Sequence, residues 1–208
     1  MDVPAPLDST VAMSYEPPSN SPRRQQVIDA AAAIFSRMGF HGASTRAIAD
    51  MLGMKVASLY FHIESKDDAL EEICVLGTQR TKGYLEQALD EHDELADRIR
   101  RFFGLLREDY VANADYVNVS IHEGRYLTAN AKARLAAVSR AFRNELDAML
   151  EAAARAGELH PGITPRQARF MVIATMRSSS ELYTRGNIRD FDNIMQAWAE
   201  AIIRALCV

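Results

Sequence analysis

The sequence predicts an all-α fold of about nine helices. After Ser21, apolar side chains recur at intervals of three and four residues almost without interruption, which is typical of amphipathic helices. No segment alternates apolar and polar residues for long enough to predict a sheet, and no internal repeat is present. Glycine and proline residues divide the helical pattern into segments.

The N-terminal residues 1–21 are predicted to be a disordered tail. Four prolines, Pro4, Pro6, Pro17 and Pro18, lie there among small polar residues without apolar periodicity.

Residues 22–66 are predicted to form a small three-helix domain. Pro22 suits the first position of a helix, and Gly39 ends that helix. One apolar face runs along it, made of Val27, Ile28, Ala31, Ile34, Phe35 and Met38. Two shorter helices then follow within residues 44–66, a span too small to form a core alone.

The two short helices have the pattern of a helix-turn-helix. Ile48, Ala49 and Leu52 recur at helical spacing, Gly53 tolerates a positive φ at the turn, and a second apolar set follows, made of Leu59, Tyr60 and Ile63. In this motif the second helix enters the major groove of DNA. The outward groups of residues 55–62 are therefore predicted to meet DNA.

Residues 67–208 are predicted to form a larger helical domain. Ser65 and Asp68 have the spacing of a capping box, so a long helix begins there and breaks near His92 and Asp93. A fifth helix carries Ile99 to Tyr110 on one face. The remaining segments are a short helix with loops at 113–126, a long helix at 130–157, and two final helices at about 164–184 and 190–206, separated by residues 185–187.

Charge is unevenly distributed along the chain. The net charge is −4, which argues against a protein that coats nucleic acid, yet residues 22–66 hold six basic side chains against three acidic ones. Only this segment is electropositive, which is the sign that a phosphate-contacting module requires.

Other functional classes receive little support from the composition. Cys74 and Cys207 lie far apart within apolar patterns and are predicted to be buried small hydrophobes, with no disulfide, zinc site or cofactor. No apolar run is long enough to span a membrane, and the N-terminus lacks the pattern of a signal peptide. We therefore expect a soluble cytoplasmic protein.

Residues 22–70 resemble the N-terminal DNA-binding domain of the TetR family of transcriptional regulators. The matching residues are Ala31, Ala32, Phe35, Gly39, Phe40, Ser44, Thr45, Ile48, Ala49, Gly53, Leu59, Tyr60, His62, Ser65, Lys66 and Leu70. The remainder of the chain matches in helical layout. The resemblance implies a DNA-binding head followed by an effector-binding and dimerisation domain.

The resemblance also implies which residues contact the DNA backbone. Thr45 and Arg46 open the first helix of the motif, where unsatisfied N–H groups can bind a phosphate. Tyr60 and His62 are assigned to the recognition helix, and Lys66 to the first turn of the next helix. The alternatives are that Thr45 is a plain N-cap, that the Tyr60 ring is buried against the first helix, and that Lys66 is merely solvated.

Base contacts are assigned to Lys55, Val56, Ala57, Ser58 and Phe61, because lysine can contact guanine, serine can donate or accept, and Val56 or Ala57 can touch a thymine methyl. The alternatives for Phe61 are that it packs against a sugar or shields the core. Lys55 departs from the family, which commonly has a small hydroxyl residue there. The recognition helix therefore lacks a good cap, at a cost of about 1 kcal/mol.

The last two helices are predicted to form a homodimer interface, which suits a palindromic operator. An apolar seam runs along the final helix, made of Phe191, Ile194, Met195, Trp198, Ile202 and Leu206, and the preceding helix offers Phe170, Met171, Ala174, Ser178 and Ser179. Two helices from each subunit would form an intermolecular bundle. The alternative is that both helices serve only the internal core.

A small-molecule effector is expected among the helices of the larger domain. The candidate lining residues are Phe102, Phe103, Leu106, Tyr110, Tyr116, His122, Arg125, Met176 and Arg177. The apolar members suit an apolar or acyl-type ligand, and the polar ones could orient a carboxylate or phosphate, although core and salt-bridge roles are open to them too. The stretch HEGRYL, residues 122–127, resembles family members that sense acyl-CoA intermediates.

The sequence thus predicts a ligand-responsive regulator, a repressor that an effector releases from its DNA operator. One alternative is an architectural protein that binds DNA without sequence preference, which would need broader basic charge. Another is an enzyme that uses the helical pocket, but the chain has no nucleophile–base pairing, HExxH, ExxH pair or glycine-rich phosphate loop.

Overall fold

The computed structural model describes residues 21–89, 93–185 and 188–208. Within these ranges the chain forms nine α-helices and one short 3₁₀ helix, so the predicted all-α fold is confirmed. The elements are α1 (Pro22–Gly42), α2 (Thr45–Met51), α3 (Val56–Leu59), α4 (Lys66–Ala88), α5 (Leu95–Ala112), α6 (Ala114–His122), η1 (Gly124–Tyr126), α7 (Ala129–Ala156), α8 (Pro165–Arg185) and α9 (Ile188–Leu206). The predicted tail, Ser21 excepted, lies outside the described residues, and so do most of the two predicted breaks, at 90–92 and 186–187.

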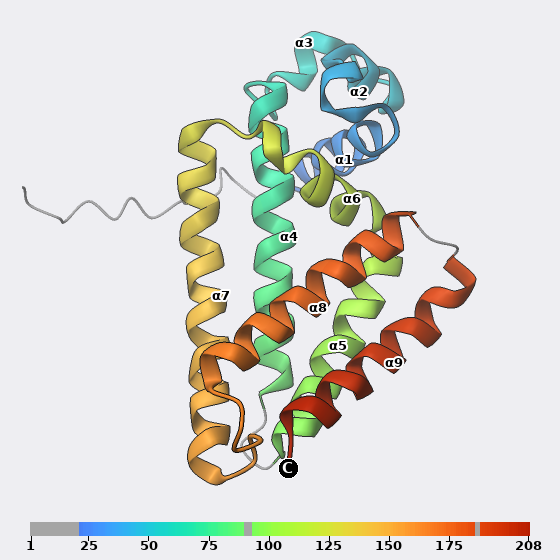
Figure 1. The fold of residues 1–208 in the computed structure, drawn as a ribbon. Helices are drawn as coiled ribbons and strands as arrows, with labels where there is room; N and C mark the ends of the chain where they lie inside the picture. The colour runs from blue at the N-terminus through green and yellow to red at the C-terminus, as the bar shows by residue number, and fades with distance from the viewer. Residues whose placement is uncertain (1–20, 90–92, 186–187) are drawn as a thin grey trace, which may run out of the picture.

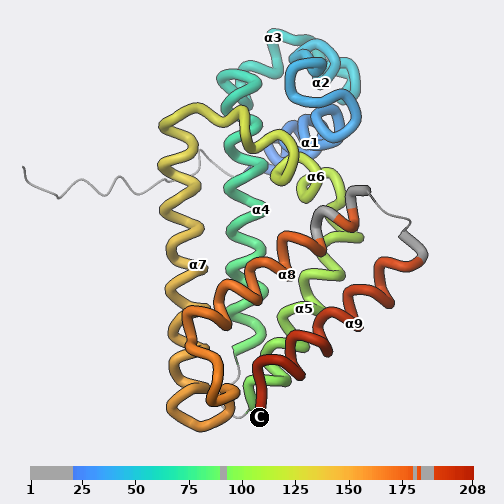
Figure 2. Tube along the Cα trace, viewed as in Figure 1, coloured from blue at the N-terminus to red at the C-terminus, as the bar shows by residue number. Residues whose placement is uncertain are grey.

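The helices divide between two ends of the molecule (Figure 1). Helices α1, α2 and α3 cluster at one end, which we call the head. Helix α4 runs from the head through the larger part, which we call the body, and packs along α7. Helices α5, α8 and α9 complete the body, and the C-terminus lies at the far end from α2 and α3 (Figure 2).

The predicted helix boundaries are set by capping residues. The Ser65 side chain accepts from the Asp68 N–H at 3.1 Å and so caps α4, as the capping-box pattern predicts. Gly39 has a φ of 70° and interrupts α1, and Gly157 has a φ of 77° and ends α7. Both glycines adopt left-handed backbone that other residues rarely take.

The core of the body is built around α5. Phe102, Phe103 and Leu106 are almost fully buried there, among side chains from α4, α7, α8 and α9. Burial on this scale is the main favourable contribution to folding of the body.

The core of the head extends beyond the head itself. Val27, Ile28 and Phe35 of α1 pack with Leu59, and with side chains from the body. These body residues are Tyr116, Val119, Leu127 and Ala131, which come from α6, the turn after η1 and the start of α7. The hydrophobic contacts of the head therefore continue past residue 66.

Both cysteines are free thiols in this fold. Cys74 is buried, and the burial raises its pKa to about 12, whereas Cys207 is half-buried. Among the residues that the structure describes, no helix is long and apolar enough to cross a membrane, and no group of acidic, histidine and cysteine side chains could hold a metal ion.

Candidate nucleic-acid interface

The start of α2 is organised by two hydroxyl side chains. Ser44 caps the helix by accepting from the Ala47 N–H at 3.1 Å, so the alternative in which Thr45 is the N-cap is wrong. Thr45 is instead the first helical residue, and its Oγ1 lies 3.5 Å from the phenol oxygen of Tyr60. The structure thus brings together two of the predicted phosphate contacts.

The recognition helix α3 is only four residues long, Val56–Leu59. Lys55 occupies its N-cap position without a side-chain capping bond, as predicted. The prediction that Tyr60 and His62 lie on this helix is wrong, because Tyr60 is its C-cap and the chain continues as turns through His62. A backbone bond from the His62 N–H to the Leu59 carbonyl, 2.8 Å long, keeps these turns compact.

The predicted base-reading side chains differ in exposure. Lys55, Ala57 and Phe61 are exposed, and Phe61 reaches 86% exposure, while Val56 and Ser58 are half-buried. Tyr60 is 52% exposed, so the alternative in which its ring is buried against the first helix is wrong. Large apolar groups this exposed are candidates for contact with a partner.

Arg46 lies on the exposed side of α2. Its guanidinium pairs with Asp50 at 3.9 Å, and both side chains are mostly exposed. An ion pair of this kind contributes only about 0–1 kcal/mol. Exchanging it for a phosphate would therefore cost little.

Lys66 has partners that the sequence did not predict. Its ammonium donates to the carbonyls of Phe40 and Ala43, at 2.7 and 3.0 Å, and lies 4.4 Å from the centre of the Phe40 ring. The alternative of a merely solvated lysine is therefore wrong. At most one of its three N–H donors remains for a phosphate.

The apolar residues predicted to line an effector pocket are packed together in the body core. The Phe102 and Phe103 rings meet edge to face with centroids 5.6 Å apart, and Leu106 is equally buried. The Tyr110 hydroxyl donates to the Met176 carbonyl at 3.2 Å. The structure groups these five residues, as predicted, but as close-packed core.

The polar residues of the predicted pocket lie on other elements, and their sharing one effector site with the apolar residues stays a prediction. Tyr116 belongs to the head core, and its hydroxyl donates to Asp29 at 2.7 Å. His122 ends α6, Arg125 lies over the Tyr126 ring at 4.8 Å, and Arg177 is an exposed residue of α8.

Glu123, beside these residues, connects the body to the head. Its carboxylate accepts from the Phe40 backbone N–H at 2.7 Å. The last turn of α1 is thus held by Glu123 from one side and by Lys66 from the other. The charged residues of the HEGRYL stretch are a weak signal for this contact in the sequence.

The predicted dimer seam on α9 is wrong for three of its six residues. Phe191, Met195 and Leu206 are buried in the protomer's own core, which agrees with the alternative of an internal role, and on α8 the same holds for Ser179. The outer face keeps the predicted residues Phe170, Ala174, Ser178, Ile194 and Trp198, and it also includes Ala197 and Ala201.

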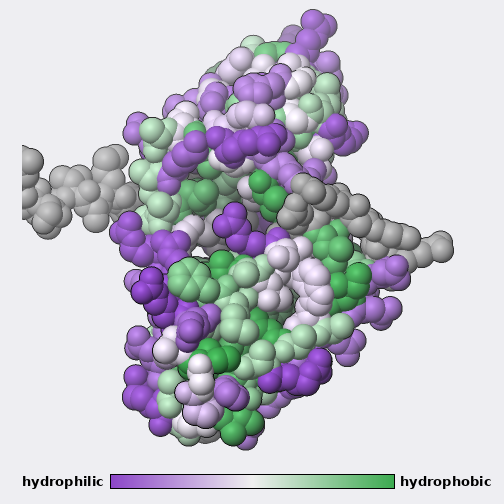
Figure 3. All heavy atoms as spheres, in the orientation of Figure 1, coloured by the Kyte–Doolittle hydropathy of each residue, from purple (hydrophilic) through white to green (hydrophobic). Residues whose placement is uncertain are grey.

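This outer face is apolar and hollowed. Apolar side chains gather over α8 and α9 in Figure 3, whereas the head is mainly hydrophilic. A hollow of about 470 Å³ lies there, lined by Met171, Ala174, Thr175, Ser178, Trp198, Ala201, Ile202 and Ala205. These are mostly small side chains, which permit close approach of another helix.

A three-helix head with an exposed turn and recognition helix, joined by a long helix to an all-α body, is the architecture of a helix-turn-helix transcriptional regulator. The family model for bacterial regulatory proteins of the tetR family matches residues 27–73, and that for the tetracyclin repressor-like C-terminal domain matches residues 92–206. The chain therefore belongs to the TetR family.

Several known proteins are similar over most of the chain. The HTH-type transcriptional repressor KstR2 of Rhodococcus jostii is 25% identical over 98% of this chain and 97% of its own. The fatty acid metabolism regulator protein of Bacillus subtilis is 24% identical over 74% of this chain and 80% of its own.

Solved structures share the fold. A tetR-family regulatory protein from Rhodococcus RHA1 superposes with a TM-score of 0.79, at 22% identity, over 90% of this chain and 99% of that chain. The regulator FadR of Bacillus subtilis, solved in complex with stearoyl-CoA, superposes with a TM-score of 0.67, at 21% identity, over 86% of this chain and 95% of that chain.

Proposed function

We propose that this protein is a homodimeric cytoplasmic repressor that binds a palindromic DNA operator through its two heads and leaves it when a coenzyme A thioester binds the body. The observation that carries the proposal is the match of both family models, one to the head and one to the body. The exposed side chains of α2, α3 and the following turn supply hydrogen-bond donors and apolar groups that can contact DNA.

The DNA contacts divide into two groups. Thr45, Arg46 and Tyr60 lie at the start of α2 and the end of α3, where they can hold phosphates on one side of the groove. His62 is half-buried and a fourth candidate, and Lys66 can contribute one donor. The proposed base contacts are those that the sequence predicts, made by Lys55, Val56, Ala57, Ser58 and Phe61.

The dimer is proposed to form through the outer face of α8 and α9. Phe170 is 55% exposed at one edge, and the hollow beside Trp198 is lined by small and apolar side chains. Such a face favours a four-helix contact with its own copy, because an isologous interface pairs the same patch on both subunits. A dimer would also place two heads on one DNA duplex, as a palindrome requires.

The effector class rests on the relatives. FadR of Bacillus subtilis was solved with stearoyl-CoA, and KstR2 of Rhodococcus jostii is a repressor similar over nearly the full chain. In this protein the HEGRYL segment contacts both α4 and the last turn of α1. An acyl-CoA that displaces this segment would therefore change how the head is held.

Selection of DNA from a pool of random duplexes, with the purified full chain, tests the proposal. We expect enrichment of a palindrome, because two identical heads read two half-sites. A double variant Arg46→Ala with Lys55→Ala should bind the selected duplex at least about tenfold more weakly. The matched control Arg140→Ala with Arg155→Ala removes the same charge from exposed positions on α7 and should bind as the unaltered protein does. Failure to enrich any sequence would contradict the proposal.

The effector is tested on the same duplex. Stearoyl-CoA should release the protein, whereas coenzyme A alone and stearate alone should not. Sedimentation of the free protein should give the mass of two chains. Release by none of the three compounds would contradict the effector class while leaving the DNA-binding function intact.

A further inference from the structure

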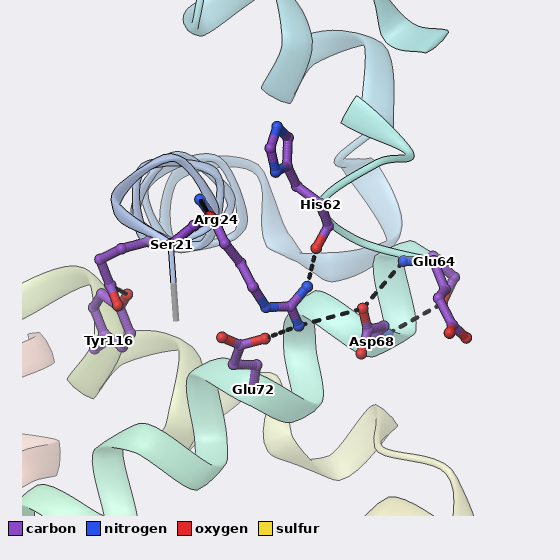
Figure 4. Close-up of polar contacts among 9 residues, drawn as sticks. Ser21, Arg24, His62, Glu64, Asp68, Glu72 and Tyr116 are labelled. Atoms are coloured by element: carbon purple, nitrogen blue, oxygen red, sulfur yellow. Dashed lines mark hydrogen bonds and ion pairs between the residues drawn. The ribbon is translucent and has the colours of Figure 1, made fainter. Parts of the chain in front are cut away.

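The strongest unexplained feature of the head is a buried arginine. Arg24 lies in the first turn of α1 and is only 7% exposed. Arginine is almost never buried without partners, because removing its charge from water is costly. Its side chain reaches across the head toward the segment after α3 and toward α4 (Figure 4).

The two ends of the Arg24 guanidinium have different partners. Nη1 donates to the backbone carbonyl of His62, and Nη2 donates to the carboxylate of Glu72 on α4. The same Nη2 lies 3.8 Å from Asp68. A planar guanidinium can hold two acceptors in a fixed relation, which a lysine cannot do. We call the contacts of Arg24 with His62 and Glu72 the clamp.

Asp68 fixes the next residues of the same segment. Its carboxylate accepts from the Glu64 N–H at 3.1 Å, while the Ser65 side chain accepts from the Asp68 N–H. Residues 62–65, which join the end of the DNA-facing turn to α4, are therefore held by side chains from both α1 and α4. Breaking the hydrogen bonds of backbone groups that are held in this way costs free energy.

Burying the charged Glu72 carboxylate costs free energy. Burial raises its pKa above the ordinary value, and the attraction of Arg24 opposes that rise. Glu72 is 8% exposed and lies one full turn along α4 from Asp68. The arrangement keeps two buried charges where apolar packing would serve stability equally well, which points to a role in fixing one geometry.

We propose that Arg24 is a positioning residue for DNA recognition, which orients the segment of Tyr60, Phe61 and His62 by holding the His62 carbonyl against Glu72. This inference rests on the proposed DNA-binding function. Arg24 does not touch DNA, because its charged end is buried and occupied on the inner side of the segment. Its effect passes through the backbone of residues 60–63.

Glu71 provides a matched control on the same helix. It is buried to the same degree as Glu72, but its carboxylate pairs with Arg134 of α7. Glu71→Gln and Glu72→Gln are therefore identical chemical changes at adjacent positions, of which only the second disturbs the clamp.

Operator affinity across a salt series tests the inference in the full chain. Arg24→Met should weaken binding to the selected duplex by about tenfold or more, the effect of losing roughly one hydrogen bond to a charged group. Glu72→Gln should weaken binding less, and Glu71→Gln should leave binding unchanged. The double variant Arg24→Met with Glu72→Gln should bind the duplex no more weakly than Arg24→Met alone. The slope of log Kd against log salt concentration should stay that of the unaltered protein, because no phosphate contact is lost.

Backbone hydrogen exchange supplies a readout without DNA. Arg24→Met and Glu72→Gln should speed exchange in peptides covering 60–66, and leave peptides of α5 and α9 unchanged. Arg24→Lys, which keeps the charge but not the fork, should resemble Arg24→Met. Glu72→Gln retains an acceptor and similar volume, so it tests the clamp even if Arg24→Met unfolds the head.

The outcomes separate this inference from the proposed function. Unchanged operator affinity in both variants would overturn it, and so would a salt slope reduced by about one, which would make Arg24 a direct phosphate contact. If the unaltered protein binds no duplex, the proposed function fails and the positioning role fails with it. Unchanged exchange at 60–66 would overturn the clamp in either case.

Discussion

The tip of the head and the core of the body use large aromatic side chains in opposite ways. The head exposes Tyr60 and Phe61 at its tip, whereas the body buries Phe102 and Phe103 in contact with each other. The exposed pair contributes little to folding and lies where a partner can reach it, while the buried pair contributes mainly to folding. Aromatic content alone therefore does not distinguish a binding surface from a core.

The largest expected effect separates these two uses directly. Phe102→Ala should lower the free energy of unfolding by about 3–5 kcal/mol, because it leaves a cavity in a packed core. Phe61→Ala should change it by no more than about 0.5 kcal/mol. Denaturant unfolding at one fixed protein concentration measures both. A loss below about 1 kcal/mol for Phe102→Ala would indicate a loosely packed region and would favour the predicted effector pocket there.

A smaller loss of stability is expected at Lys66, which begins α4 beside the head and holds the end of α1. Lys66→Met should lower the free energy of unfolding by about 1–3 kcal/mol, since the carbonyls of Phe40 and Ala43 lose their donor. The control Lys55→Met, at an exposed position, should stay within about 0.5 kcal/mol of the unaltered protein. Equal stability of the two variants would mean that the hydrogen bonds of Lys66 do not stabilise the fold.

A gain of stability is expected at Lys55. Lys55→Ser supplies the missing hydroxyl cap of α3 and should raise the free energy of unfolding by about 1 kcal/mol. Lys55→Ala is the control that removes the lysine without adding a cap. If Lys55 reads guanine, operator affinity should fall in both variants although only one is more stable. Equal stabilities in the serine and alanine variants would mean that the serine does not cap this helix.

Arg46 should show the smallest change in stability. Arg46→Ala loses an exposed pair with Asp50, so unfolding should change by at most about 0.5 kcal/mol. The salt slope of operator binding should nevertheless fall by about one, because a phosphate contact is lost. Arg140→Ala, from an exposed position on α7, should leave that slope unchanged. An unchanged slope in the Arg46 variant would remove Arg46 from the interface.

Local patterns predicted the head more accurately than the body. The capping box at Ser65 and Asp68 and the uncapped start at Lys55 depend on residues three or fewer positions apart, and both are confirmed. The roles of Arg24 and Lys66 were missed because their partners lie 48 and 26 residues away in the chain. Both belong to the six basic side chains of residues 22–66 but are engaged within the fold, so the exposed positive charge of the head is smaller than its sequence implies.

In the body, apolar periodicity predicts the helices but not what their buried faces contact. Apolar periodicity predicted its helices well, because a helix must bury one face. The same periodicity does not say whether a buried aromatic residue lines a cavity or fills it. On α9 it likewise could not separate the residues that face the protomer's own core, such as Met195, from those on the outer face, such as Trp198.

The head core that continues into α6 and α7 has a consequence for modular engineering. A chimera that transplants residues 22–66 onto another regulator would take Val27, Phe35 and Leu59 away from Tyr116, Val119 and Leu127, on which they pack. Such an exchange would expose an apolar underside and loosen the recognition segment. Substituting exposed side chains of α2 and α3 keeps the packing between head and body. New operator specificities are therefore better obtained by substitutions in this head than by exchanging heads.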